Sequence, residues 1–320
     1  MSIRGRFVWE ELMTTDLGSA ASFYGKVGGM KTKKAPFDPD YTMFVGSSGS
    51  MGGMMLLPDE AKRMGTPPMW ISYIGVQNTD ETARTIATLG GKVHKQPWSI
   101  ADGGRIAICA DPQGAMFALY ANPKMTDAPP HPTLGHASWH ELATTDYISA
   151  FSFYQNVFGW HVVNDMDMGP GMGIYRLFAA EGSSDQLGGM YTKPANQPGP
   201  PAWLPYIKVA SVQKATDAAK KLGAMIMHGP ADVPGGKITM GADPQGAMFA
   251  VHEVVGTTTA AERASKPGAK AAGKSATKKA APAKKKSAAK KKKAAPKRKA
   301  KAKAAKKKAA PKKRKAGSKK

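Results

Sequence analysis

Cysteine is almost absent from the 320-residue chain, which has a single one at position 109. One thiol cannot form an internal disulfide, so a disulfide-stapled secreted scaffold is excluded and a reducing compartment is expected. The chain also lacks an apolar run near the roughly 18 residues of a membrane span, and its N-terminal segment has no apolar stretch of the signal-peptide kind. These absences predict a soluble cytoplasmic protein without a transmembrane segment.

Acidic residues are nearly missing from one part of the chain only. Residues 261–320 hold 24 Lys, 3 Arg and one acid, Glu262, a net charge of +26. The remaining 20 basic and 22 acidic residues give the first 260 positions a net charge of −2. The chain is therefore a near-neutral body with a polycationic tail, and the overall charge of +24 describes neither part.

The tail, residues 257–320, lacks aromatic residues and cannot bury enough apolar surface to fold alone. Its Lys/Ala/Pro units resemble the C-terminal domain of linker histone H1 and the lysine-rich tails of some bacterial nucleoid proteins. Such a density of lysine neutralises phosphates whatever the base sequence, so nucleic acid is the expected partner. Acidic lipid binding and a purely solubilising tail are the alternatives. The residues expected to contact nucleic acid are Lys284, Lys285, Lys286, Lys290, Lys291, Lys292, Lys293, Lys297, Arg298, Lys299, Lys306, Lys307, Lys308, Lys312, Lys313, Arg314 and Lys315.

The body contains an internal repeat. Residues 5–16, GRFVWEELMTTD, return at 135–146 as GHASWHELATTD, and ADPQGAMFA occurs at both 110–118 and 242–250. Phe-Tyr and Trp-x-x-Tyr pairs recur between these landmarks. We therefore expect a duplicated domain: a first copy over residues 1–125, a linker over 126–134 and a second copy over 135–256.

The local signals within each copy alternate in a fixed order. In the first copy, residues 7–13 are predicted as a strand, and Asp16 caps a helix that Gly28-Gly29 ends. Strands follow, the pattern restarts at residue 70, and a DPQG turn joins the last two strands. Each copy is therefore two βαβββ modules. The predicted strands are 7–13, 41–45, 51–57, 70–76, 93–97, 105–109 and 115–120, with a second helix from 78 or 79 to 89.

These motifs resemble the vicinal oxygen chelate superfamily, which includes glyoxalase I, bleomycin-resistance proteins and extradiol dioxygenases. The doubled set, with WxEL at the start and DPQGAxF at the end of each copy, looks like the two-domain glyoxalase-like proteins of bacteria. The resemblance covers residues 5–256 and implies an α+β fold of two tandem domains, each a cupped mixed sheet. It also implies a bacterial source, and the tail then predicts a nucleoid-associated location. The reaction stays open, because this fold hosts several chemistries.

The resemblance also implies where a metal would lie in metal-dependent members. There, His, Gln or Glu side chains on the first and last strands of each module hold a divalent ion that acts as a Lewis acid. Tryptophan, aliphatic residues, glycine and methionine at these positions do not suit a hard or borderline cation. We therefore predict no metal ligand and no cofactor. The positions carry Trp9, Ile71, Ala118 and residues 51–55 in the first copy, and Trp139, Leu204, Ala250 and residues 187–190 in the second.

Strand alternation places further side chains on the cavity face beside these positions. Apolar walls with a few convergent polar groups predict a pocket for a small apolar or aromatic ligand. Glu11, Glu141 and His252 are the candidate catalytic residues, because a half-buried carboxylate facing a phenol or an imidazole can act as a general base. The predicted ligand-binding residues are Trp9, Glu11, Tyr73 and Tyr120 in one cup and Trp139, Glu141, Tyr206 and His252 in the other.

Structural roles for the same residues stay open beside these functional ones. Trp9 and Trp139 fit ordinary core positions, and the two glutamates fit hydrogen bonding to backbone amides at strand ends. His140 is expected to face solvent or the other domain, because neighbouring side chains in a strand point in opposite directions.

We therefore expect a glyoxalase-like small-molecule-binding protein that lacks the usual metal site and is tethered to nucleic acid by its tail. Whether it is an enzyme stays open; the enzyme alternative is a metal-dependent lyase or dioxygenase of the same superfamily. A second alternative is a nucleoid-associated DNA-binding protein whose body senses a ligand. A homodimer is a further expectation.

Overall fold

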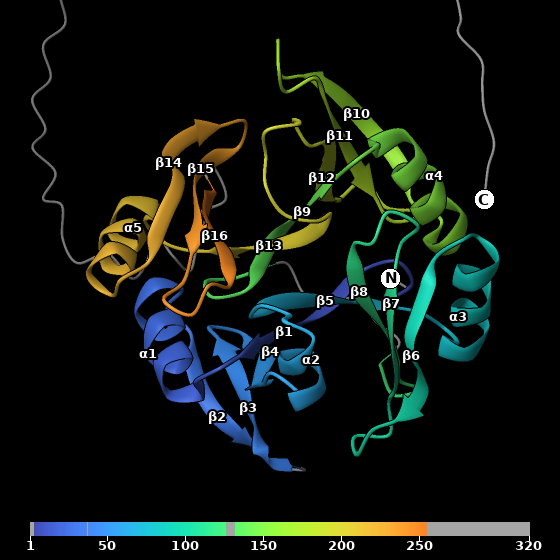
Figure 1. Cartoon of the computed structure of the whole chain (residues 1–320), viewed down its shortest axis with the longest axis horizontal. Coiled ribbons are helices and arrows are strands. Elements are labelled where there is room, and N and C mark those ends of the chain that lie inside the picture. Colours follow the sequence, from blue (N-terminus) through green and yellow to red (C-terminus); the bar gives the residue numbers. More distant parts are fainter. Residues whose placement is uncertain (1–2, 37, 126–131, 255–320) are drawn as a thin grey trace, which may run out of the picture. The chain divides into compact units, whose positions relative to one another are not determined.

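A computed structural model of the chain describes residues 3–36, 38–125 and 132–254. Each repeat copy forms one eight-stranded mixed sheet with its two longer helices packed on one face (Figure 1). The predicted α+β fold of two tandem domains is therefore confirmed. The tail with its predicted nucleic-acid contacts, and most of the predicted linker, lie outside the described residues. No helix in the described part of the chain is long and apolar enough to span a membrane.

Domain 1 has the strand order β2-β3-β4-β1-β5-β8-β7-β6. The first strands of its two modules, β1 and β5, pair antiparallel at the centre of the sheet, and each also pairs parallel with the last strand of its own module. Its elements are β1 (Phe7–Thr14), α1 (Leu17–Val27), β2 (Lys31–Ala35), β3 (Asp38–Gly46), β4 (Gly49–Leu56), α2 (Asp59–Arg63), β5 (Met69–Gly75), α3 (Thr79–Thr88), β6 (Lys92–Ser99), β7 (Arg105–Ala110) and β8 (Met116–Ala121).

Domain 2 repeats this topology in the order β10-β11-β12-β9-β13-β16-β15-β14. Strands β9 and β13 take the central places. Its elements are β9 (Ala137–Thr144), α4 (Tyr147–Phe158), β10 (His161–Asp167), β11 (Ile174–Ala179), β12 (Gln186–Thr192), β13 (Ala202–Lys208), α5 (Val212–Lys221), β14 (Met225–Val233), β15 (Gly236–Ala242) and β16 (Met248–Val254).

Two elements of domain 1 have no counterpart among the predicted ranges. Strand β2 reads Lys-Thr-Lys-Lys-Ala and exposes its first four residues at the edge of the sheet, so it lacks the apolar alternation of a half-buried strand. Helix α2 has five residues, none of them buried. Neither element has the periodic pattern of apolar residues by which a strand or a helix is predicted from a sequence.

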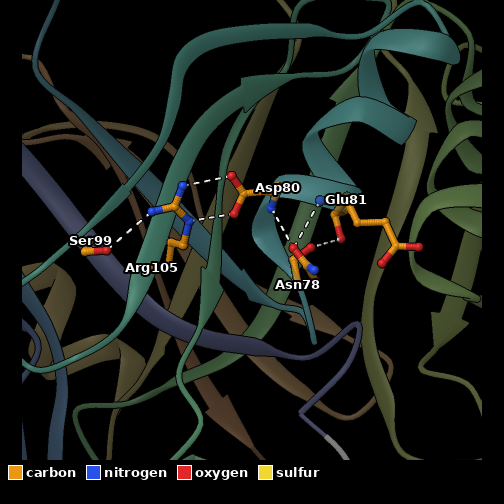
Figure 2. A network of polar contacts seen from close by, with 6 residues as sticks. Asn78, Asp80, Glu81, Ser99 and Arg105 are labelled. Atoms are coloured by element: carbon orange, nitrogen blue, oxygen red, sulfur yellow. Dashed lines mark hydrogen bonds and ion pairs between the residues drawn. The ribbon is translucent and has the colours of Figure 1, made fainter.

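Side-chain caps begin the helices where the sequence predicts them. Asp16 accepts hydrogen bonds from the amides of Gly18 and Ser19, at 2.8 and 3.1 Å. Figure 2 shows the corresponding start of α3, where Asn78 caps the helix. There Arg105 of β7 holds Asp80 of α3 through two hydrogen bonds of 2.6 and 2.8 Å. This bidentate pair fixes the helix to the back of its own sheet.

Residues of both domains share the two main apolar cores. Helix α1 of domain 1 lies beside α5 of domain 2, and α3 lies near α4 (Figure 1). One core joins Phe117 of domain 1 to Tyr154 and Trp160 of domain 2, and the other joins Phe23 of domain 1 to Phe249 of domain 2. The helix-covered faces of the two sheets are therefore buried together, which leaves the opposite faces free to form the cups.

The repeated TTD and DPQG motifs contact each other across the two domains. Gln245 of domain 2 accepts hydrogen bonds from the Thr14 hydroxyl at 2.7 Å and from the Asp16 amide at 2.6 Å, and donates to the Asp16 carbonyl at 3.0 Å. Gln113 of domain 1 makes the reciprocal contacts with residues 144–146. Motifs that mark the repeat in the sequence thus hold the two copies together.

The repeated Phe-Tyr and Trp-x-x-Tyr motifs complete this interface inside the cores. The hydroxyl of Tyr24 donates to Asp243 at 3.0 Å and accepts from the Trp70 indole at 3.1 Å. The equivalent Tyr154 is bonded to Asp111 at 3.1 Å and to the Trp203 indole at 2.8 Å. Both tyrosines are 0% exposed, so their bonds to Asp243 and Asp111 join the domains without competition from water.

The equivalent residues Glu10 and His140 meet at the centre of the interface. His140 Nε2 lies 2.6 Å from Glu10 Oε1, and Ser72 donates to the other carboxylate oxygen at 2.5 Å. The imidazole also stacks on Phe7, with ring centroids 3.6 Å apart. Of the two predicted surroundings for His140, solvent is therefore wrong and the other domain is right, since both side chains are almost fully buried.

Candidate functional site

The open face of the domain 1 sheet encloses a cavity of about 720 Å³, here called cup 1. That volume is typical of pockets for drug-sized molecules. Its wall is largely apolar and includes methionine side chains from β1, β3, β4 and β8. The aromatic residues that line it are Trp9, Tyr41, Tyr73, Trp98 and Tyr120.

A carboxylate held by two phenols lies in the wall of cup 1. Tyr41 donates to Glu11 Oε2 at 2.9 Å, and Tyr73 donates to Glu11 Oε1 at 3.1 Å. The Trp9 indole in turn donates to the Tyr41 hydroxyl at 2.9 Å. The alternative that Glu11 bonds backbone amides at a strand end is thus wrong, because phenols occupy both of its oxygens.

Glycine in β4 makes room for one of these phenols. Gly53 pairs with Glu11 across β1 and β4, and a Cβ atom at Gly53 would clash with the Tyr41 hydroxyl. The ring of Tyr41 therefore lies over the strand position where the resemblance places a metal-binding side chain. A larger residue at position 53 is incompatible with this carboxylate–phenol contact.

Burial governs the electrostatics of the cluster. It raises the pKa of Glu11, although hydrogen bonds from Tyr41 and Tyr73 and the charge of Lys95 act in the opposite direction. Burial also raises the pKa of both tyrosines, and the Glu11 charge adds to this effect. Glu11 is therefore a stronger base than a solvated carboxylate, and the phenols stay protonated as hydrogen-bond donors.

The mouth of cup 1 carries a second set of polar groups. Tyr120 donates to Asp102 at 2.9 Å and accepts from Asn122 at 2.9 Å, and burial raises the pKa of its phenol to about 12. On strand β6, the Lys95 ammonium lies 3.8 Å from the centre of the Trp98 ring. These residues give an otherwise apolar cavity a polar rim.

Domain 2 repeats the carboxylate–phenol cluster in cup 2, the open face of its own sheet. Glu141 accepts from Tyr175 at 2.9 Å and from Tyr206 at 3.0 Å, and the Trp139 indole donates to Tyr175 at 2.9 Å. A Cβ atom at Gly189 would clash with Tyr175, as at the equivalent position of domain 1. Burial again raises the pKa of the glutamate. The alternative that Glu141 bonds backbone amides at a strand end is therefore wrong as well, because phenols donate to both of its oxygens.

The two cups differ at their rims. His252 takes the place of Tyr120, and Ser138 takes the place of Val8. His252 Nδ1 lies 3.1 Å from the Ser138 hydroxyl, whereas its Nε2 is buried without a hydrogen-bond partner among the described residues. Burial, and then the charge of Lys208, lowers the pKa of His252, which keeps the imidazole neutral near pH 7.

The side chains at the nominal ligand positions of cup 1 do not suit a metal ion of the kind that metal-dependent relatives bind. Trp9, Ile71 and Ala118 stand on the central strands with no oxygen or imidazole to offer. Within the described ranges, no three His, Cys, Asp or Glu side chains gather closely enough to hold an ion. Glu11 accepts hydrogen bonds from Tyr41 and Tyr73, and it lies outside the nominal ligand positions.

The geometry and the sequence profile together define the class of protein. The profile of the Glyoxalase/Bleomycin resistance protein/Dioxygenase superfamily matches residues 6–119 and 133–251, and the chain belongs to this superfamily. It is 29% identical over 248 residues to "Putative glyoxylase CFP32" of Mycobacterium tuberculosis, covering 76% of this chain and 92% of that protein. It is 26% identical over 263 residues to the anthracycline biosynthesis protein DnrV of Streptomyces peucetius, covering 78% and 94%.

Solved structures share the fold at low sequence identity. The Mn(II)-bound glyoxalase of Novosphingobium aromaticivorans aligns with a TM-score of 0.56 at 15% identity, over 79% of this chain and 83% of that one. The 2,3-dioxygenase LapB of Pseudomonas sp. KL28 aligns with a TM-score of 0.56 at 13% identity, over 79% and 93%. Such a likeness establishes the fold alone.

The structure brings all four predicted residues of cup 1 to one cavity: Trp9, Glu11, Tyr73 and Tyr120. In cup 2 it brings Trp139, Glu141 and Tyr206 into one cluster, and places His252 at the rim position equivalent to Tyr120. Tyr41 and Tyr175 are not among the residues predicted from the sequence. A repeated Tyr-x-x-Phe, at residues 41–44 and 175–178, is the signal that would have found them.

Proposed function

We propose that the body binds a planar, largely apolar aromatic molecule in cup 1, with no metal ion at the nominal ligand positions. The observation that carries the proposal is a cavity of about 720 Å³ walled by tryptophan, tyrosine and methionine around one carboxylate. Flat rings stack well on aromatic walls, and methionine adapts to irregular apolar outlines. The carboxylate–phenol cluster supplies hydrogen bonding for one polar group of the ligand.

The relative from Streptomyces peucetius, which is named for anthracycline biosynthesis, supports this ligand class. Anthracyclines are fused, hydroxylated ring systems, which are planar and mostly apolar. Cup 1 has the volume for such a scaffold and a polar site on its wall. We therefore choose alizarin, a planar dihydroxyanthraquinone, as the probe.

Equilibrium dialysis of the full chain against alizarin, with a chelator present, tests the proposal. The dye should bind with a Kd in the micromolar range, about −8 kcal/mol. Met116→Trp fills cup 1 and should weaken binding there at least about tenfold, whereas the equivalent Met248→Trp in domain 2 leaves cup 1 unchanged. Absence of binding, or equal binding by the Met116→Trp chain, refutes the proposal.

The metal-dependent enzyme is the second candidate, because the manganese-bound glyoxalase has the same fold. A metal-dependent enzyme would hold one divalent ion tightly in each active cup. Stoichiometric manganese, iron, nickel or zinc in protein purified without added chelator would favour it, and would contradict the metal-free cup.

We further propose that the tail tethers the body to nucleic acid. The support is its net charge of +26 over 60 residues, beside a body of −2. Each phosphate that lysine neutralises releases a counterion, so binding is independent of base sequence and weakens steeply with salt. The body then acts as the ligand-binding part of a nucleoid-associated protein.

Fluorescence anisotropy with a mixed-sequence DNA duplex tests the tether. Affinity should fall by about 10³-fold or more between about 50 and 200 mM salt, and deletion of residues 261–320 should abolish it. Undiminished DNA binding by the truncated chain would contradict the proposal. Vesicles of acidic lipid serve as the competing polyanion, and a preference for them over DNA would also contradict it.

A further inference from the structure

We infer that Glu11 is a metal-independent base that removes a proton from a carbon beside a ligand carbonyl, giving the cup a keto–enol isomerase activity on planar aromatic ketones. This inference rests on the proposed function, because the ketone must first occupy the cup. It goes further by assigning a reaction and the atom that carries it.

The contacts of Glu11 leave it able to reach a ligand. A carboxylate offers about four lone-pair directions, and Tyr41 and Tyr73 each take one. Glu11 lines the cavity, so a remaining direction is available to a bound molecule. Tyr73 lines the same cavity, and among the described residues its oxygen makes only the hydrogen bond that it donates to Glu11.

Duplication supports a role for the whole arrangement. The hydrogen bonds of cup 2, at 2.9, 3.0 and 2.9 Å, match those of cup 1, at 2.9, 3.1 and 2.9 Å. The rims of the two cups differ, since His252 replaces Tyr120. The cups thus share the carboxylate, its two phenols and the indole, whereas the groups around them vary.

The surroundings suit proton transfer. Burial raises the pKa of Glu11, and a base is most effective when its pKa lies near the working pH. The apolar wall also strengthens the interaction between a phenol and a developing negative charge. The protonated phenols of Tyr41 and Tyr73 are the donors that such a charge needs.

The step balances without any other reactant. A Glu11 oxygen takes the proton from the carbon; the C–H electron pair becomes the C=C bond of the enolate, and the carbonyl π pair moves onto oxygen. A neutral carboxyl group needs fewer donors than a carboxylate, so the Tyr73 hydroxyl is released to donate to the enolate oxygen. Return of the proton from Glu11 to the same or a conjugated carbon restores the ketone and the carboxylate.

Deuterium exchange into 2-tetralone tests the inference, because this benzo-fused ketone has acidic hydrogens beside its carbonyl. The full chain is incubated with it in D₂O containing a chelator, and NMR follows both the loss of the C1 proton signal and the binding of the ketone. We expect exchange about 10²-fold faster than in matched buffer when the cup is saturated.

Matched variants assign the activity to the cluster. Glu11→Gln should lower the rate at least about twofold, and Glu11→Gln with Glu141→Gln should return it to the buffer rate while the ketone still binds. In the Glu141→Gln background, where only cup 1 is active, Tyr73→Phe removes one donor and should slow exchange by about 10-fold or more. Glu81→Gln, at an exposed site on α3, is the control and should leave the rate unchanged.

The outcomes separate this inference from the proposed function. A chain that binds 2-tetralone without accelerating exchange, or that binds alizarin but not 2-tetralone, overturns the isomerase and leaves the binding function intact. Exchange that stops when the chelator is added, or that survives in the double glutamine variant, also overturns it. A chain that binds neither probe contradicts both proposals.

Discussion

Removing one buried hydroxyl from the interface between the domains should destabilise the whole body. Tyr24→Phe deletes the oxygen that bridges the Trp70 indole and Asp243, with bonds of 3.1 and 3.0 Å. A hydrogen bond to a charged group contributes about 1.5–3 kcal/mol, and a buried donor without a partner costs about 1–3 kcal/mol. Since Tyr24 is 0% exposed, water cannot replace the lost oxygen, and we expect a loss of about 3–4 kcal/mol.

The repeat supplies a matched test of that magnitude. Tyr154→Phe removes the equivalent bridge between Trp203 and Asp111 and should cost a similar amount. The two bridges share no residues, so the double variant should lose the sum of the two single losses. Tyr147→Phe, for which no hydroxyl bond is seen among the described contacts, should stay within about 0.5 kcal/mol of the parent.

Urea denaturation of the full chain, followed by tryptophan fluorescence, measures these losses. Because both cores contain residues of both domains, each variant should shift a single transition to lower urea. Losses below about 1 kcal/mol in both variants would refute the interface argument. So would two separate transitions, of which only one responds to each substitution.

Three further predictions use the same assay. Gln113→Ala and Gln245→Ala should each cost about 1–2 kcal/mol, because each removes several bonds to the opposite domain at partly exposed positions; a change in only one would contradict the reciprocal arrangement. His140→Phe should cost about 3–5 kcal/mol by leaving the buried Glu10 without its imidazole, and adding Glu10→Leu should recover part of the loss; a double variant no better than the single would disprove this. Because burial raises the Glu11 pKa from 4.5, the folded chain holds that proton longer than the unfolded one, so the stability contributed by Glu11 falls as pH rises through the interval above 4.5. Glu11→Gln should make the pH-dependent fall smaller, because only Glu141 then contributes to it, and an unchanged pH profile would contradict this.

The fold can be predicted from the sequence because each local motif occurs twice, once in each copy of the repeat. Nine identical residues at 110–118 and 242–250 mark the same turn twice, and the alternation of strands and helices follows between such landmarks. Strand alternation also groups Trp9 and Glu11 on the cavity face, and the resemblance adds Tyr73 and Tyr120 through the sheet that it implies. These inferences need only local periodicity and knowledge of the sheet.

What the sequence could not predict depends on contacts between distant segments. Tyr41 reaches Glu11 because Gly53, on a third strand, leaves room for its ring. The repeat likewise does not say whether the DPQG turn of one copy contacts its own TTD motif or that of the other. Only packing of the two sheets shows that Gln245 belongs with residues 14–16.

A crystal structure of the chain with alizarin would show the ligand and any metal ion in cup 1 together. We expect the dye in cup 1, against Trp9 and within hydrogen-bond distance of Tyr73 or Glu11, with no anomalous peak from a transition metal. An empty cup at saturating dye would contradict it. An ion bound to Glu11 in place of its two phenols would contradict it as well.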